Sequence, residues 1–174
     1  FDEIHRKNFG FGRVELYKKF LGKLDRSIRI LEVGSNVGIQ LAILKKMGFK
    51  NLYGIEINKD AVATSHQLFS GINAIEGSAL DIPFKDGYFD LVFTAAVLIH
   101  FSKQDLGKSL SEIYRCSKKY IWGYEYFSEK QTNIIYQGKK NILWKANYAG
   151  EFLKTFKDLK LVKKEKILYL NNDN

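Results

Sequence analysis

The sequence lacks the residues and segments that would place it in several classes of protein. Its 174 residues include one cysteine and one proline. No apolar run approaches the roughly 20 residues that a membrane-spanning helix needs. The single cysteine, Cys116, excludes an intrachain disulfide, and no cysteine and histidine cluster predicts a metal site. We therefore expect one cytoplasmic domain over residues 1–174, without membrane attachment.

Positive charge is in excess and unevenly distributed. The 28 lysines and arginines outnumber the 19 acidic residues, which gives a net charge of +9 at pH 7. Residues 1–100 carry +2 of that charge and residues 101–174 carry +7. Such an excess fits an anionic substrate or nucleic acid, and it equally fits a solvated lysine-rich surface. Because the lysines are scattered without a dense basic run, we predict that nucleic acid is not the partner.

Helix-like and strand-like segments alternate along the chain. Helical spacing covers residues 2–24, 41–47, 60–69 and 103–116, and strands are expected over 28–33, 52–57, 73–76, 89–94, 120–126 and 159–170. The first strands are near-continuous apolar runs, which is typical of strands buried on both faces. The pattern predicts an α/β fold, a doubly wound and mostly parallel Rossmann-like sheet flanked by helices. We divide it into an N-terminal helical segment (1–26), a cofactor-binding half (27–100) and an acceptor-side half (101–174).

A glycine pair lies where the first strand turns into a helix. Residues 31–38 read Leu-Glu-Val-Gly-Ser-Asn-Val-Gly. Glycine at these places allows a tight turn and a close approach of the backbone to a ligand. The spacing differs from the Gly-x-Gly-x-x-Gly of nicotinamide binders, and no Walker lysine follows. Since many α/β loops contain a glycine pair without any ligand, this signal needs a second one.

The second signal is Glu56, at the end of the second strand and 22 residues after Gly34. A carboxylate there can accept hydrogen bonds from both hydroxyls of a ribose, although a surface carboxylate is the alternative. A third signal is the loop after the third strand, where Ser78 and Asp81 could bond an adenine and Asp81 could equally cap a turn. The predicted cofactor-binding residues are Glu32, Gly34, Ser35, Asn36, Gly38, Glu56, Ile57, Ser78, Ala79, Leu80 and Thr94.

In order and spacing these motifs resemble those of class I S-adenosylmethionine-dependent methyltransferases, over roughly residues 28–100. A narrower resemblance, to the methylases associated with pseudaminic acid biosynthesis, covers nearly the whole chain. It rests on segments 1–3, 6–8, 32–38, 53–58, 77–81, 97–100, 144–145 and 148–151. The resemblance implies S-adenosylmethionine as cofactor and methyl transfer to a small-molecule acceptor, such as a sugar or nucleotide sugar of surface glycans.

Two departures from that narrower group fall in the acceptor region. The group carries Arg-Gly-His where this sequence reads Gln137-Gly138-Lys139, and Arg-Asp where it reads Ala146-Asn147. Both departures leave the identity of the acceptor open. The sequence also ends at Asn174, where the family usually has a seventh strand, so we expect a sheet that lacks its last strand.

Residues after the fourth strand are candidates for chemistry on the acceptor. Histidine side chains in general titrate near neutral pH, so His100 could take a proton from an acceptor hydroxyl or amine. The alternative is a histidine satisfied by backbone at a helix entry. The predicted acceptor residues are Tyr124, Glu125, Tyr126, Tyr136, Trp144 and Tyr148. Their aromatic rings could instead cover the open side of the sheet.

The sequence is also compatible with two other functions. An RNA methyltransferase would fit the charge of +9. The sequence has neither an Asp/Asn-Pro-Pro-aromatic motif nor a Pro-Cys motif, and no RNA-binding module is appended. The other alternative is a protein that binds S-adenosylmethionine without catalysis.

Overall fold

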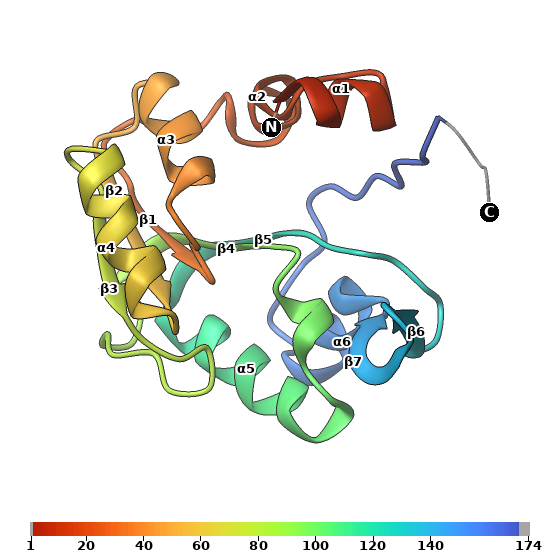
Figure 1. Ribbon diagram of the computed structural model, residues 1–174. Helices are drawn as coiled ribbons and strands as arrows, with labels where there is room; N and C mark the ends of the chain where they lie inside the picture. Colours follow the sequence, from red (N-terminus) through yellow and green to blue (C-terminus); the bar gives the residue numbers. More distant parts are fainter. Residues whose placement is uncertain (1, 171–174) are drawn as a thin grey trace.

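The computed structural model describes residues 2–170 and is built on one parallel β-sheet (Figure 1). The strand order is β3-β2-β1-β4-β5, and every neighbouring pair is parallel. The strands are β1 (Arg29–Val33), β2 (Asn51–Glu56), β3 (Asn73–Glu76), β4 (Phe89–Ala95) and β5 (Ser117–Tyr124). The first strand lies at the centre and the chain winds outward in both directions, which confirms the doubly wound prediction.

Helices cover both faces of the sheet (Figure 1). They are α1 (Asp2–Phe9), α2 (Arg13–Leu21), α3 (Ile39–Lys46), α4 (Lys59–Leu68), α5 (Lys103–Cys116) and α6 (Tyr148–Thr155), with a 3-10 turn η1 (Leu98–His100). One core cluster joins α2 and α3 to the sheet, and the other joins α5 and α6 to its opposite face. Strand β4 serves both, because Phe93 enters the first cluster and Val92 the second. In the described part of the chain, no helix is long and apolar enough to span a membrane.

The expected N-terminal helix over 2–24 is wrong as one element. Helix α1 ends at Phe9 and α2 begins at Arg13. Gly10 between them has a φ of +80°, which the helix cannot accommodate. Phe1, where the resemblance to the narrower group begins, lies outside the described residues.

The expected strand over 159–170 is also wrong, because residues 159–169 form no regular secondary structure. The segment runs back to the N-terminal helices instead of pairing with β5. There Lys19 and Glu165 form an ion pair at 2.6 Å, and the amide of Leu170 donates to the carbonyl of Asn8 at 2.8 Å. The apolar residues that suggested a strand are as compatible with an extended segment held by side chains.

A hairpin that the sequence did not suggest follows β5. Strands β6 (Thr132–Tyr136) and β7 (Lys139–Lys145) pair antiparallel. The two-residue turn has positive φ at both Gln137 (48°) and Gly138 (74°), as a type I′ turn requires. Most side chains of the hairpin are exposed, so the burial alternation that identifies a strand is absent.

Gly54 on β2 shows how closely the sheet is packed beneath the first loop. A Cβ at Gly54 would lie 2.6 Å from Ser35 Oγ and 3.0 Å from Leu41 Cδ1. We expect Gly54→Ala to lower the free energy of unfolding by about 1–3 kcal/mol through overpacking. Gly107→Ala is the matched control, because nothing lies within 4 Å of its Cβ position in α5. It should raise stability by about 0.5–1 kcal/mol. Urea unfolding of both variants measures this, and equal effects would contradict the packing described.

Candidate functional site

The candidate site lies at the carboxyl edge of the sheet. Parallel strands direct all their carboxyl ends to the same edge, where ligands of open α/β sheets bind. The loops after β1, β2, β3 and β4 and the end of β5 therefore meet there. These segments carry most of the residues that the sequence predicted.

The glycine loop after β1 lies directly against the loop after β4. Gly34 has a φ of +72°, and a Cβ there would lie 2.5 Å from Val97 Cγ2. Gly38 has a φ of +81°, and its Cβ would lie 2.6 Å from Ser65 Oγ. Any larger residue would displace these neighbours. The sequence predicted the tight turn, but not the contact with Val97, which no local pattern indicates.

Glu56 is held in place by the backbone on both sides of it. Its Oε2 accepts from the amide of Asn36 at 2.9 Å, and its Oε1 from the amide of Asn58 at 3.0 Å. Each carboxylate oxygen can accept a further hydrogen bond, so the group can also accept from a pair of hydroxyls. The next side chain, Ile57, is 74% exposed and offers apolar surface to a flat ring.

Glu32 is a buried carboxylate at the end of β1. Burial raises the pKa of Glu32 well above its usual value, and the charge of Glu56 raises it further. Glu32 Oε2 has no hydrogen-bond partner among residues 2–170, and neither does the buried Ser35 Oγ. Unpaired buried polar atoms cost free energy. These atoms fit a ligand that brings a cation or an N–H donor.

The loop after β3 forms a short turn of its own. The amide of Leu80 donates to Ser78 Oγ at 3.1 Å, and the amide of Asp81 donates to the Ser78 carbonyl at 3.1 Å. Ser78 therefore caps this turn through its side chain, and the carboxylate of Asp81 is left exposed. Ala79 is partly buried against the core.

Glu125, just after β5, fastens the loop that leads into η1. Its Oε1 accepts from the amides of Val97 at 3.1 Å and Leu98 at 3.3 Å, while its Oε2 is buried without a partner in the described part of the chain. Thr94, predicted for the cofactor, is buried beside this carboxylate; burial raises the pKa of Glu125, and the Thr94 hydroxyl lowers it in part. Ala96 lies in the chain between Thr94 and Val97 and has a φ of +57°. Strained conformations of this kind concentrate at functional sites.

His100 ends η1 with its side chain exposed. Its backbone amide donates to the Val97 carbonyl at 3.0 Å, but its ring has no hydrogen bond to another described residue. The alternative interpretation required a hydrogen bond between this ring and the backbone, and the described residues provide none. Strand β7 packs against η1, so the hairpin lies beside this histidine.

The predicted acceptor residues divide into two groups. Tyr148 donates to the carbonyl of Trp144 at 2.9 Å. Burial raises the pKa of Tyr148, and the charge of Glu125 raises it further. Tyr148 belongs to the core cluster on the side of α5 and α6, and its hydrogen bond places it next to Trp144. The inner wall of a cavity of about 1160 Å³ includes Glu125, Tyr148 and Thr94.

The other three predicted acceptor residues point elsewhere. Tyr124 packs on the α2 and α3 face, where its hydroxyl lies 3.1 Å from His5 Nε2. Tyr126 reaches Tyr169 at 3.3 Å between hydroxyls, and Tyr136 is 51% exposed at the end of β6. The sequence gave no signal for His5, which is buried and docks α1 on the end of β5.

The charge state of Glu125 should affect how the stability of the protein depends on pH. Burial raises the pKa of Glu125 to about 7, against partial opposition from the backbone amides that it accepts. Because the folded state then holds more protons between about pH 4.5 and 7, stability should fall with rising pH by up to about 3 kcal/mol in that window. Glu125→Gln should remove this part of the slope in thermal unfolding. Glu129→Gln, exposed on the same segment, should retain the full slope, and identical slopes in all three proteins would contradict the assignment.

No group of three or more histidine, cysteine, aspartate or glutamate side chains within residues 2–170 is arranged to hold a metal ion. The features that can hold a ligand are the two glycines, the Glu56 carboxylate that two amides orient, the exposed Ile57 side chain and the unpaired oxygen of Glu32. Together they suit a ligand with vicinal hydroxyls, a flat ring and a cationic group.

Comparisons with known proteins agree with this geometry. Residues 31–120 match the family described as Methyltransferase domain. The phosphoethanolamine N-methyltransferase of Plasmodium falciparum is 27% identical over 112 residues, which cover 62% of this chain and 42% of that enzyme. The chain therefore spans less than half the length of this curated relative.

Solved structures share the fold. The PH0226 protein of Pyrococcus horikoshii superposes with a TM-score of 0.67 at 20% identity, covering 82% of this chain and 79% of that one. The [4+2]-cyclase SpnF superposes at 0.60 with 16% identity, covering 83% and 55%. Since a cyclase shares the fold, the fold alone does not fix the reaction. The family match covers more than half of the chain, including the glycine loop and Glu56. The chain thus belongs to the methyltransferase domain family.

Proposed function

We propose that this chain methylates a small molecule and that its acceptor is a sugar or nucleotide sugar of surface-glycan biosynthesis. The relative from Plasmodium is named for a small acceptor, phosphoethanolamine, which supports a small-molecule substrate. The sugar class rests on the sequence resemblance to the pseudaminic acid-associated methylases. The single buried free thiol, Cys116, is consistent with a reducing compartment such as the cytoplasm.

The donor site is assigned to the first half of the sheet edge. Glu56 accepts hydrogen bonds from the two ribose hydroxyls, and the amides of Asn36 and Asn58 already fix the orientation of its carboxylate. Ile57 packs on the adenine, and the unpaired Oε2 of Glu32 receives the amino group of the methionine end. The pre-positioned carboxylate of Glu56 is the observation that carries this assignment.

The acceptor site is assigned to the second half, under the β6–β7 hairpin. When bound, S-adenosylmethionine supplies a methyl group on a positively charged sulfur. The chain's own task is then to orient the acceptor and exclude water. A ring nitrogen of His100 takes the proton that the acceptor hydroxyl or amine loses, and releases it to solvent. Trp144, on the strand that packs against η1, closes the pocket.

The alternative acceptor is RNA, and one observation favours it. Lysines that are scattered in the sequence line a single cavity along the free edge of β5. They are Lys118, Lys119, Lys160, Lys163, Lys164 and Lys166. Several are already engaged, such as Lys163 over the ring of Phe20 at 4.6 Å. A complex with RNA whose affinity falls steeply with salt would establish this alternative in place of the small molecule.

The donor assignment predicts the effect of removing Glu56. We expect Glu56→Ala to weaken binding of S-adenosylhomocysteine by about 1–3 kcal/mol, because ribose hydroxyls are left unpaired. Glu76→Ala is the matched control, since Glu76 is the register partner of Glu56 on β3, and among residues 2–170 its ion pair is with exposed Lys59 at 3.5 Å. Calorimetry should show unchanged affinity for the control. Unchanged affinity for Glu56→Ala would reject the donor site.

The acceptor assignment predicts a loss of turnover without loss of donor binding. His100→Ala should lower the rate about 10²–10⁴-fold, the usual contribution of a general base, on a panel of amino and deoxy sugars. Trp144→Ala should raise the acceptor KM. His66→Ala is the control, because His66 bonds the Ala74 carbonyl at 2.7 Å far along α4 and should leave turnover unchanged. Full activity in both test variants, or weakened donor binding, would overturn the acceptor site.

A further inference from the structure

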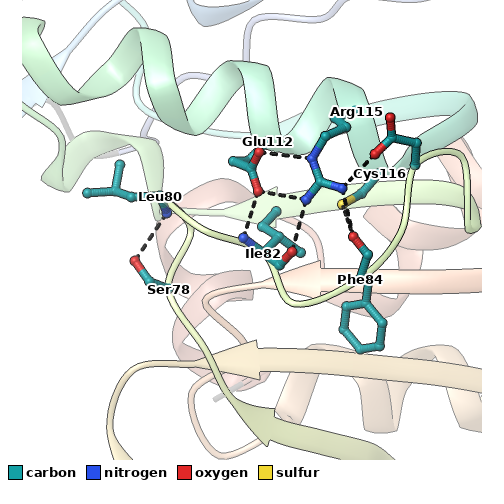
Figure 2. Close-up of polar contacts among 8 residues, drawn as sticks. Ser78, Leu80, Ile82, Phe84, Glu112, Arg115 and Cys116 are labelled. Carbon is teal, nitrogen blue, oxygen red and sulfur yellow. Dashed lines mark hydrogen bonds and ion pairs between the residues drawn. The ribbon is translucent and has the colours of Figure 1, made fainter.

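The last turn of α5 is fastened to the loop between β3 and β4. Arg115 Nη2 donates to the carbonyl of Ile82 at 2.9 Å, and Arg115 Nη1 to that of Phe84 at 2.7 Å. The amide of Ile82 donates to Glu112 Oε2 at 2.7 Å (Figure 2). One arginine and one glutamate, a turn apart on the helix, therefore bind both polar backbone groups of Ile82.

The two side chains also bind each other through two contacts. Arg115 Nε lies 2.9 Å from Glu112 Oε1, and Arg115 Nη2 lies 2.7 Å from Glu112 Oε2. This bidentate pairing fixes the guanidinium plane. It also lowers the pKa of Glu112 and raises that of Arg115, so both stay charged. The contact of Arg115 with Asp86, whose side chain is 79% exposed, adds little.

More contacts hold the same loop to the same helix. The amide of Gly87 donates to the Arg115 carbonyl at 2.8 Å, and the Cys116 thiol donates to the Phe84 carbonyl at 3.7 Å. At its other end the loop is fixed to the sheet, where the amide of Gly77 donates to the Glu56 carbonyl at 3.1 Å. Only residues 78–81 lie between these two fixed ends.

That short turn follows β3 at the carboxyl edge of the sheet, and its two ends are the fixed points described above. We propose that Glu112 and Arg115 are positioning residues that make the donor site selective for adenine. By fixing Ile82 they fix the turn of residues 78–81, whose backbone and side chains then meet the polar edge of the base. This inference rests on the donor site of the proposed function, and neither residue touches the donor.

The test compares two ligands that differ only at the edge of the base. We expect the wild-type chain to bind S-adenosylhomocysteine about tenfold or more tightly than its hypoxanthine analogue, S-inosylhomocysteine. In Arg115→Ala the turn is released, and calorimetry should show this ratio falling to about threefold or less. Arg115→Lys, which keeps the charge but not the fork, should give an intermediate ratio. Glu112→Gln gives a second measurement that does not require Arg115→Ala to fold, and its ratio should fall as well.

Arg26→Ala is the matched control. The Arg26 guanidinium also fastens a loop, through the carbonyls of Gly22 and Leu24 at 2.7 and 2.9 Å, and it stacks on Phe49 at 4.4 Å. It lies outside the β3–β4 loop, so its loss should cost stability without changing the ratio. An unchanged ratio in folded Arg115→Ala or Glu112→Gln, or an equal fall in Arg26→Ala, would overturn the proposal. A wild-type chain that binds both ligands equally would also overturn it and leave the donor site standing, whereas no binding of either would reject the donor site itself.

Discussion

The contact between Gly34 and Val97 is the constraint on which the site depends. The loop after β1 and the loop after β4 approach so closely that a single Cβ at Gly34 would lie 2.5 Å from a Val97 methyl carbon. The first loop belongs to the half assigned to the donor and the second leads to His100. Because the loops cannot approach more closely, the packing of the Gly34 backbone against the Val97 side chain sets a minimum distance between the two halves.

Two buried carboxylates lie on the two sides of this contact. Glu32 lies beneath the glycine loop and Glu125 beneath the loop into η1. Each has an oxygen without a partner among residues 2–170, and burial raises the pKa of each. Such groups weaken the fold at neutral pH. Their retention at the edge where ligands bind is in keeping with the usual exchange of stability for function.

Arg115 and Glu112 of α5 fix the third loop, which joins β3 and β4. They are far along the chain from residues 78–81, yet they fix the loop's end through Ile82. Three loops at the sheet edge are thus held by three different means: a missing Cβ, a buried carboxylate, and an ion pair on a helix. The hairpin β6–β7 contacts this edge through η1, and most of its side chains are exposed.

The sequence by itself determined the five parallel strands and the places of the glycine loop and Glu56 at their carboxyl edge. Strands buried on both faces leave long apolar runs, and a glycine pair followed by an acid has a fixed spacing, so both are readable locally. It did not determine the break between α1 and α2, the hairpin, or the course of residues 159–170. These depend on glycines with positive φ and on partners far along the chain, such as Asn8 for Leu170. Likewise only the tertiary structure paired Glu125 with Val97 and Tyr124 with His5, because a side chain's type shows that it can hydrogen-bond, and only the fold decides which group it reaches.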